Sequence, residues 1–63
     1  MANEYEEIID ALKTASIFAG AKMERLCNQK KYTEALIFEA IRDTTRKMSE
    51  SVSEYQRFEE VNE

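Results

Sequence analysis

The 63-residue sequence contains no histidine, proline or tryptophan, and it has a single cysteine and a single glycine. Without histidine, general acid–base catalysis lacks its most frequent side chain, and the usual Cys/His zinc sites lack their ligands. The one thiol, Cys27, cannot form a disulfide within the chain. We therefore predict a protein that is not an enzyme, with no catalytic residue, no metal, no cofactor and no small-molecule substrate.

Long apolar runs are missing as well. The longest stretch without a charge is residues 14–21, whereas a membrane-spanning helix needs about 20 apolar residues. The sequence does not open with the basic segment and apolar core that are typical of a signal peptide. Together with the single thiol, these features predict a cytoplasmic protein with no membrane partner.

What the chain does contain is typical of helices, because Ala, Glu, Lys, Arg, Leu and Met are plentiful. Apolar residues recur at intervals of three and four in two segments, which predicts two amphipathic helices with coiled-coil-like stripes. The first stripe comprises Tyr5, Ile8, Leu12, Ala15, Ala19 and Leu26, and the second comprises Ile37, Ile41, Thr44, Met48, Val52, Tyr55 and Phe58.

We predict one all-α domain over residues 1–63: an antiparallel two-helix hairpin with a helix over about 4–28, a turn over about 28–33 and a helix over about 33–60. Asn3 and Thr33 are suitable N-caps for the two helices. Because the turn contains neither glycine nor proline, one uninterrupted helix is the alternative. It is disfavoured because residues 28–31 supply no apolar side chain and Lys30 would fall on the stripe.

Folding at the turn would bring the two stripes together in antiparallel order. The expected pairs are Ala19 with Ile41, Leu12 with Met48, and Tyr5 with Tyr55. Small residues at Ala15, Ser16, Ala19 and Gly20 would let the helices approach closely. Cys27, at the edge of the first stripe, is expected to be a small buried hydrophobe.

A two-helix layer of this size buries too little surface to be stable alone. We therefore predict a homodimer that forms a four-helix bundle and acts as a non-enzymatic protein-interaction module, such as a regulator, inhibitor, adaptor or small chaperone. The candidate dimer or partner surface is Ile17, Phe18, Leu36 and Phe38, which lie outside the two stripes.

The net charge of −4 is unevenly distributed: residues 1–21 carry −3, residues 22–47 carry +3 and residues 48–63 carry −4. The turn end of a hairpin is then basic and the end with both termini is acidic, which favours an antiparallel dimer. The same basic end supports an alternative function, RNA or DNA binding by a hairpin dimer. Its candidate contacts are Lys30, Lys31, Arg42 and Arg46.

Overall fold

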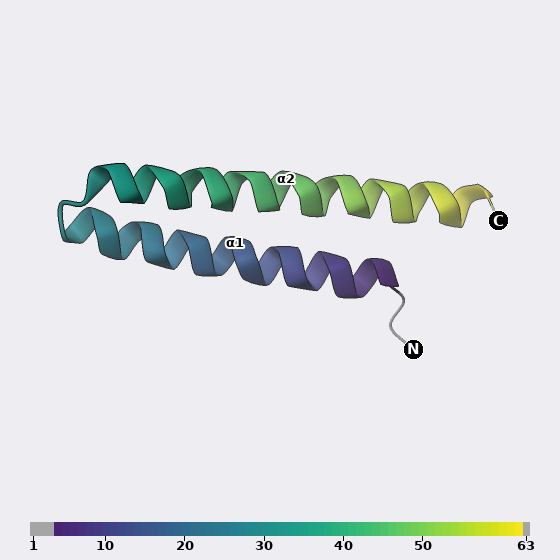
Figure 1. Ribbon diagram of the computed structural model, residues 1–63. Coiled ribbons are helices and arrows are strands. Elements are labelled where there is room, and N and C mark those ends of the chain that lie inside the picture. The colour runs from purple at the N-terminus through teal and green to yellow at the C-terminus, as the bar shows by residue number, and fades with distance from the viewer. Residues whose placement is uncertain (1–3, 63) are drawn as a thin grey trace.

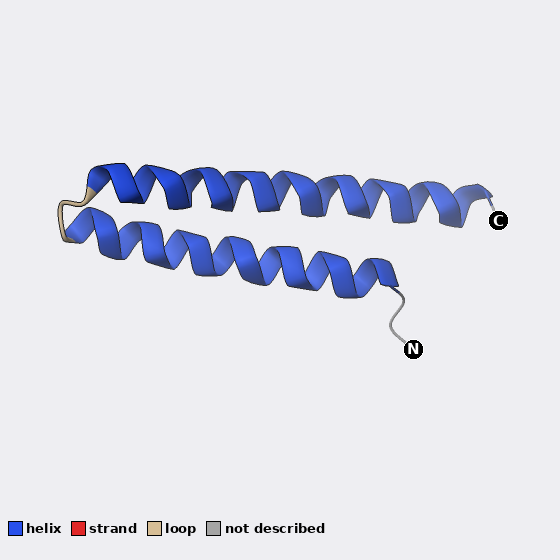
Figure 2. Ribbon diagram, viewed as in Figure 1, coloured by secondary structure: helices blue, strands red, loops and turns tan. Residues whose placement is uncertain are grey.

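The computed structural model describes residues 4–62, which form two α-helices joined by a short turn (Figure 1). Helix α1 is Glu4–Asn28 and helix α2 is Tyr32–Asn62. Residues 29–31 make the connection, drawn as the loop in Figure 2. The predicted all-helical hairpin is therefore confirmed, and the alternative of one continuous helix is wrong. Asn3, the predicted first cap, lies outside the described residues.

The hairpin is a layer one helix thick. The two helices run antiparallel and spread slightly apart toward the end that holds both termini (Figure 1). The principal extents are 51 × 19 × 10 Å. A compact chain of 7.4 kDa exposes about 4,200 Å², whereas this chain exposes 5188 Å². The layer thus leaves roughly 1,000 Å² more surface in water than a globular chain of equal mass.

Backbone geometry at the end of α1 explains how the chain turns without glycine. Lys30 has a φ of 62°, the left-handed conformation of the residue that follows a helix C-cap. The N–H of Lys31 donates to the Leu26 carbonyl (2.8 Å) and that of Lys30 to the Cys27 carbonyl (3.0 Å). These two bonds form a Schellman motif, which satisfies carbonyl groups that the helix end would otherwise leave unpaired.

The start of α2 differs from the prediction by about one residue. Helix α2 begins at Tyr32, and the N–H of Ala35 donates to the Lys31 carbonyl at 3.0 Å. Lys31 therefore occupies the cap position. Thr33, the predicted cap, already lies inside the helix, where its side chain is exposed.

The contact between the helices follows a heptad pattern, in which buried and half-buried residues alternate at intervals of three and four. We call these residues the seam. In α1 they are Tyr5, Ile9, Leu12, Ser16, Ala19, Met23 and Leu26, and in α2 they are Ala35, Phe38, Arg42, Thr45, Ser49, Val52 and Gln56. Within residues 4–60, the apolar side chains that are buried outright are Ile9, Ala19 and Ala35.

Two contacts across the hairpin fix its register. The Tyr5 hydroxyl donates to Glu59 Oε1 at 2.5 Å near the open end. A methyl group at Gly20 would lie 3.4 Å from Cδ of Arg42. Together with the heptad pattern, these contacts set Ala19 opposite Arg42 and Leu12 opposite Ser49.

The predicted pairing of the two apolar stripes is therefore wrong by one residue on α2. Ala19 does not meet Ile41, and Leu12 does not meet Met48. On the α2 stripe, Val52 alone belongs to the seam; Ile37, Ile41, Thr44, Met48, Tyr55 and Phe58 are exposed. Cys27 is also exposed, not buried as expected. Most of the larger apolar side chains of α2 thus point away from α1; Phe38 and Val52 pack against it together with smaller or more polar residues.

Candidate interaction surface

The exposed stripe of α2 follows the seam at a constant offset, because its members up to Tyr55 each precede a seam residue by one position and Phe58 continues the same spacing. Its members are Ile37, Ile41, Thr44, Met48, Ser51, Tyr55 and Phe58, all exposed. In α1 the same offset selects Glu4, Ile8, Ala11, Ala15, Phe18, Lys22 and Arg25. The apolar part of this series is Ile8, Ala11, Ala15 and Phe18, of which Ala15 is half-buried and the others are exposed. Both stripes repeat at intervals of three and four, as the surfaces of coiled-coil helices do.

The two stripes lie on the same side of the hairpin. Two facing antiparallel helices are related by an approximate two-fold axis that is perpendicular to the plane of the hairpin. This axis moves each residue along the plane but keeps it on the same side of it. Positions with the same offset from the seam, about 100° of rotation for one residue, therefore share a side. Together the stripes form one surface, which we call the apolar face.

The opposite side of the hairpin is mainly charged. It consists of the positions that follow each seam residue, which we call the charged face. In α1 these are Glu6, Asp10, Lys13, Ile17, Gly20, Glu24 and Cys27, and in α2 they are Leu36, Glu39, Asp43, Arg46, Glu50, Ser53 and Arg57. The two sides of the hairpin therefore differ in character: one carries mainly charged side chains and the other carries the apolar face.

The four side chains predicted as a dimer or partner surface do not come together. Phe18, 61% exposed, belongs to the apolar face, whereas its neighbour Ile17, 73% exposed, belongs to the charged face. Leu36 also lies on the charged face, and Phe38 is half-buried in the seam. Of this group, only Phe18 contributes to the apolar face. The Nζ atom of Lys22 lies 5.8 Å from the centroid of its ring, a cation–π arrangement at the edge of that face.

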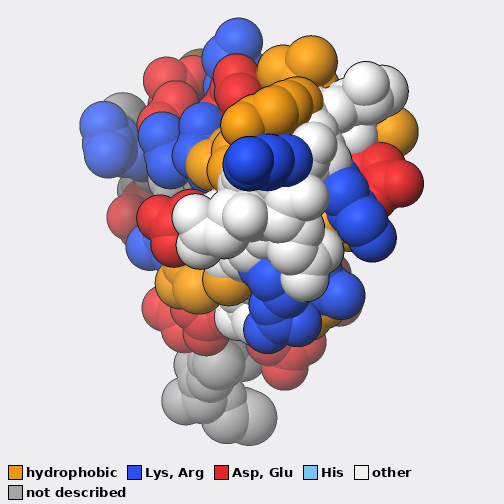
Figure 3. Space-filling view, turned by 90° about the vertical axis from the view of Figure 1, so that its left-hand side faces the viewer, with side chains coloured by type: hydrophobic (Ala, Val, Ile, Leu, Met, Phe, Trp, Pro, Cys, Tyr) orange, Lys and Arg blue, Asp and Glu red, His pale blue; other side chains and the backbone are white. Residues whose placement is uncertain are grey.

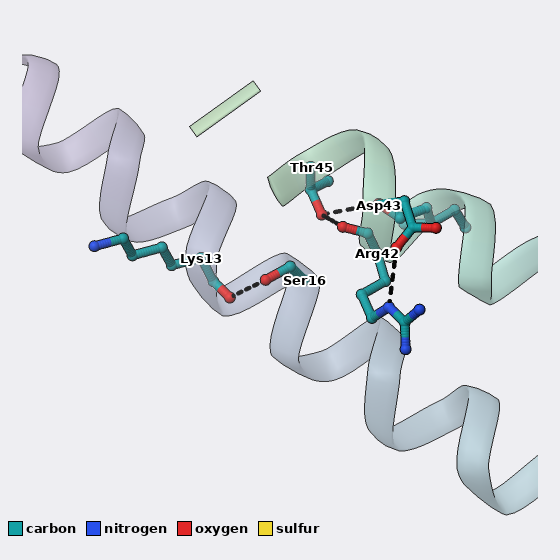
Figure 4. Close-up of polar contacts among 6 residues, drawn as sticks. Lys13, Ser16, Arg42, Asp43 and Thr45 are labelled. Carbon is teal, nitrogen blue, oxygen red and sulfur yellow. Dashed lines mark hydrogen bonds and ion pairs between the residues drawn. The ribbon is translucent and has the colours of Figure 1, made fainter. Parts of the chain in front are cut away.

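The seam also contains small hydroxyl side chains among its apolar residues. Ser49 is only 5% exposed, and its hydroxyl donates to the carbonyl of Arg46 at 2.8 Å. The Thr45 hydroxyl lies 2.8 Å from the carbonyl of Ile41, and the Ser16 hydroxyl lies 2.9 Å from the carbonyl of Lys13 (Figure 4). These hydroxyls are satisfied by their own helix backbones, so they permit close packing but add little apolar burial.

The predicted nucleic-acid contacts are divided among different environments. Lys30 and Lys31 are exposed at the turn, and Arg46 is exposed on the charged face. Arg42 is half-buried in the seam beside Gly20, and its Nε donates to Asp43 Oδ1 at 3.2 Å (Figure 4). Figure 3 shows Lys and Arg side chains around the turn end with acidic side chains among them.

Near the open end, the apolar face contains a hollow of ≈450 Å³ lined by Ser51, Glu54, Tyr55 and Phe58. These residues are spaced i, i+3, i+4 and i+7, the arrangement that receives one side chain of a facing helix in knobs-into-holes packing. The same end carries the bond from Tyr5 to Glu59, which raises the pKa of Tyr5 because the carboxylate stabilises the protonated phenol.

In comparisons with known proteins, the chain matches no protein-family model, no curated protein and no solved structure. Among the described residues, no group of three or more acidic or cysteine side chains is arranged to hold a metal ion. Neither α1 nor α2 is both long and apolar enough to cross a membrane.

Proposed function

We propose that this protein is a non-enzymatic helical interaction module that works by burying its apolar face against another helical surface. The observation that carries the proposal is the arrangement of the exposed apolar side chains, which form two aligned heptad stripes on one side of the layer. Isolated exposed hydrophobes are common on protein surfaces and need no explanation. An apolar surface that runs along α2 and the middle of α1 is typical of a protein–protein contact.

The partner that best matches this face is a second copy of the chain, which would give a four-helix bundle. A stable standard-size interface buries about 800 Å² on each partner. Burial of that area would bring the exposed surface of one chain from 5188 Å² close to the roughly 4,200 Å² of a compact chain of its mass.

Ile17 and Phe18 provide a matched test of the dimer, because they are adjacent, similarly exposed in one hairpin and located on opposite faces. We expect Phe18→Glu to abolish dimerisation at micromolar concentration, since burial of one Phe is worth about 1.5–3 kcal/mol and each dimer loses two. Ile17→Glu should leave the dimer intact. Sedimentation velocity with circular dichroism would measure both. A helical, cooperatively melting monomer of the unaltered chain would overturn the proposal.

Regulation, inhibition or adaptor activity requires a partner beyond the second copy. In a dimer that covers the apolar faces, Ile17 remains outside as an apolar side chain among charged neighbours such as Lys13 and Arg46. Loss of a bound cellular protein in Ile17→Glu, with dimer mass unchanged, would assign that partner to the charged face. Retained binding would exclude Ile17 from the contact.

The alternative function, binding of RNA or DNA, draws on the exposure of Lys30 and Lys31 at the turn. The pairing of Arg42 with Asp43 and the net charge of −4 weigh against it. Phosphate contacts release counterions, so affinity for structured RNA would fall steeply as salt rises. Salt-independent binding, or no binding at low salt, would remove this alternative.

A further inference from the structure

The stripes of the apolar face share one midpoint along the hairpin. Halfway between Ile8 and Phe18 is Lys13, and halfway between Ile37 and Phe58 the α2 stripe reaches Met48. In the register of the seam Leu12 lies opposite Ser49, so Lys13, one residue after Leu12, lies level with Met48, one residue before Ser49. A two-fold axis that runs at right angles across both helices passes each of them at the same level. The midpoints of the two stripes must therefore lie at one level for the axis to relate both stripes to their copies.

We infer that the second copy binds antiparallel, about a two-fold axis at Met48, so that each helix lies against its own copy. This inference rests on the proposed dimer and specifies its orientation and register. On α2, Met48 then meets Met48 of the second copy, and Ile41 meets Tyr55. On α1, Ile8 meets Phe18 and Ala11 meets Ala15. The same axis brings Ile37 and Phe58 to within one residue of the same level.

The hollow beside Tyr55 agrees with this register. Its four lining residues surround the level of Tyr55, and the axis at Met48 brings Ile41 of the second copy to that level. Each dimer would contain two such contacts, one at each end, and each would place a side chain in the hole that a coiled-coil helix offers. In this register Ile41 of the second copy enters the hollow without a change in the backbone of either hairpin.

Charges at the edge of the apolar face favour the same orientation. Continuing the α1 stripe at its own intervals adds Glu4 before Ile8 and Lys22 after Phe18. The axis brings Glu4 of each copy to Lys22 of the other, and each basic turn end to the other copy's acidic end. In the opposite orientation α1 lies against α2 of the second copy, which brings Glu7 level with Glu54. Like charges would then meet at the open end.

Cysteine cross-linking distinguishes the two orientations. In a Cys27→Ser background, Met48→Cys should form a disulfide-linked dimer on oxidation because the residue lies on the axis. Ser53→Cys on the charged face is the matched control and should stay monomeric on a non-reducing gel. A mixture of Met48→Cys and Ala15→Cys chains tests the other orientation, in which those two positions lie on facing helices within about 3 Å of the same level.

Each result has a separate meaning. The Met48–Met48 link without a Met48–Ala15 link supports the antiparallel register. A Met48–Ala15 link with no Met48–Met48 link overturns the orientation but leaves the dimer and the proposed function standing. A monomer mass for the Cys27→Ser chain, with no link from either variant, overturns both.

A charge exchange tests the register without relying on disulfide geometry. Lys22→Glu should weaken the dimer about tenfold, because each dimer holds two copies of the contact. Combining it with Glu4→Lys should recover most of the affinity, measured by sedimentation equilibrium at low salt. Failure of the second change to restore affinity would contradict the Glu4–Lys22 contact and with it the register.

Discussion

Leu36 and Ile37 are neighbours on the first turns of α2, they are 63% and 57% exposed in one hairpin, and they point to opposite sides of it. Leu36 lies on the charged face and Ile37 on the apolar face. Both side chains are mostly exposed and are buried to a similar extent within one hairpin. A large difference between their substitutions would therefore report what covers each side.

We expect Ile37→Gln to lower the melting temperature and make it more dependent on protein concentration, whereas Leu36→Gln should change neither appreciably. Glutamine is a good helix former, so the helix itself is little affected. Loss of one buried Ile should cost about 1.5–3 kcal/mol per chain. Thermal unfolding followed by circular dichroism at several concentrations measures it. Equal effects of the two changes would mean that the faces do not differ in coverage.

Lys30 adopts a left-handed backbone conformation that costs a side-chain-bearing residue about 1–2 kcal/mol. Lys30→Gly should therefore stabilise the folded chain by roughly 1 kcal/mol, partly offset by the greater freedom of glycine in the unfolded state. Denaturant unfolding at fixed protein concentration measures the change. Gln29→Gly is the control, since Gln29 has no positive φ, and it should not stabilise. A destabilised Lys30→Gly chain would contradict the turn geometry.

Gly20 is not required for the approach of the two helices. A Cβ atom there would meet Cδ of Arg42 at 3.4 Å, which is ordinary contact with a flexible side chain. Gly20→Ala should stabilise the chain by up to about 1 kcal/mol, because alanine is the better helix former. Ala19→Leu is the contrasting change, since Ala19 is buried in the seam and a larger side chain there would force the helices apart. A loss of stability in Gly20→Ala would indicate a further close contact at this position.

The bond between Tyr5 and Glu59 should make the open end of the hairpin sensitive to alkaline pH. The pKa of Tyr5 is raised above 10.0, its ordinary value, first by the hydrogen bond to Glu59. A group with a raised folded-state pKa contributes its full stability below the unfolded-state pKa and loses it as pH rises through the folded-state pKa. The contribution is thus present at neutral pH and lost above about pH 10.

Titration of the Tyr5 ring by NMR would measure that pKa directly. Glu59→Gln should lower it toward the ordinary value, because the neutral amide removes both the charge-assisted bond and the repulsion of the phenolate. The Tyr5→Phe chain should lose the difference in stability between neutral and alkaline pH that is due to this bond. An unchanged Tyr5 pKa in Glu59→Gln would show that the bond does not persist in solution.

Much of the fold follows from residues that act locally. The helix formers, the missing proline and the polar residues 28–31 predict two helices and the position of the turn. They act through short-range backbone preferences, which a sequence displays directly. The heptad stripe at Ile37, Ile41 and Met48 is equally visible, and its spacing correctly predicts a helical surface of apolar side chains.

Only the tertiary structure decided which side of α2 packs against α1. The sequence of α2 carries two heptad series one residue apart, and the more apolar one was expected to face α1. The structure instead places Ala35, Thr45 and Ser49 there, because small side chains let two helices pack closely while their hydroxyls bond to their own backbones. Periodicity identifies an apolar side of a helix; whether that side faces the other helix of the hairpin depends on packing between residues far apart in sequence.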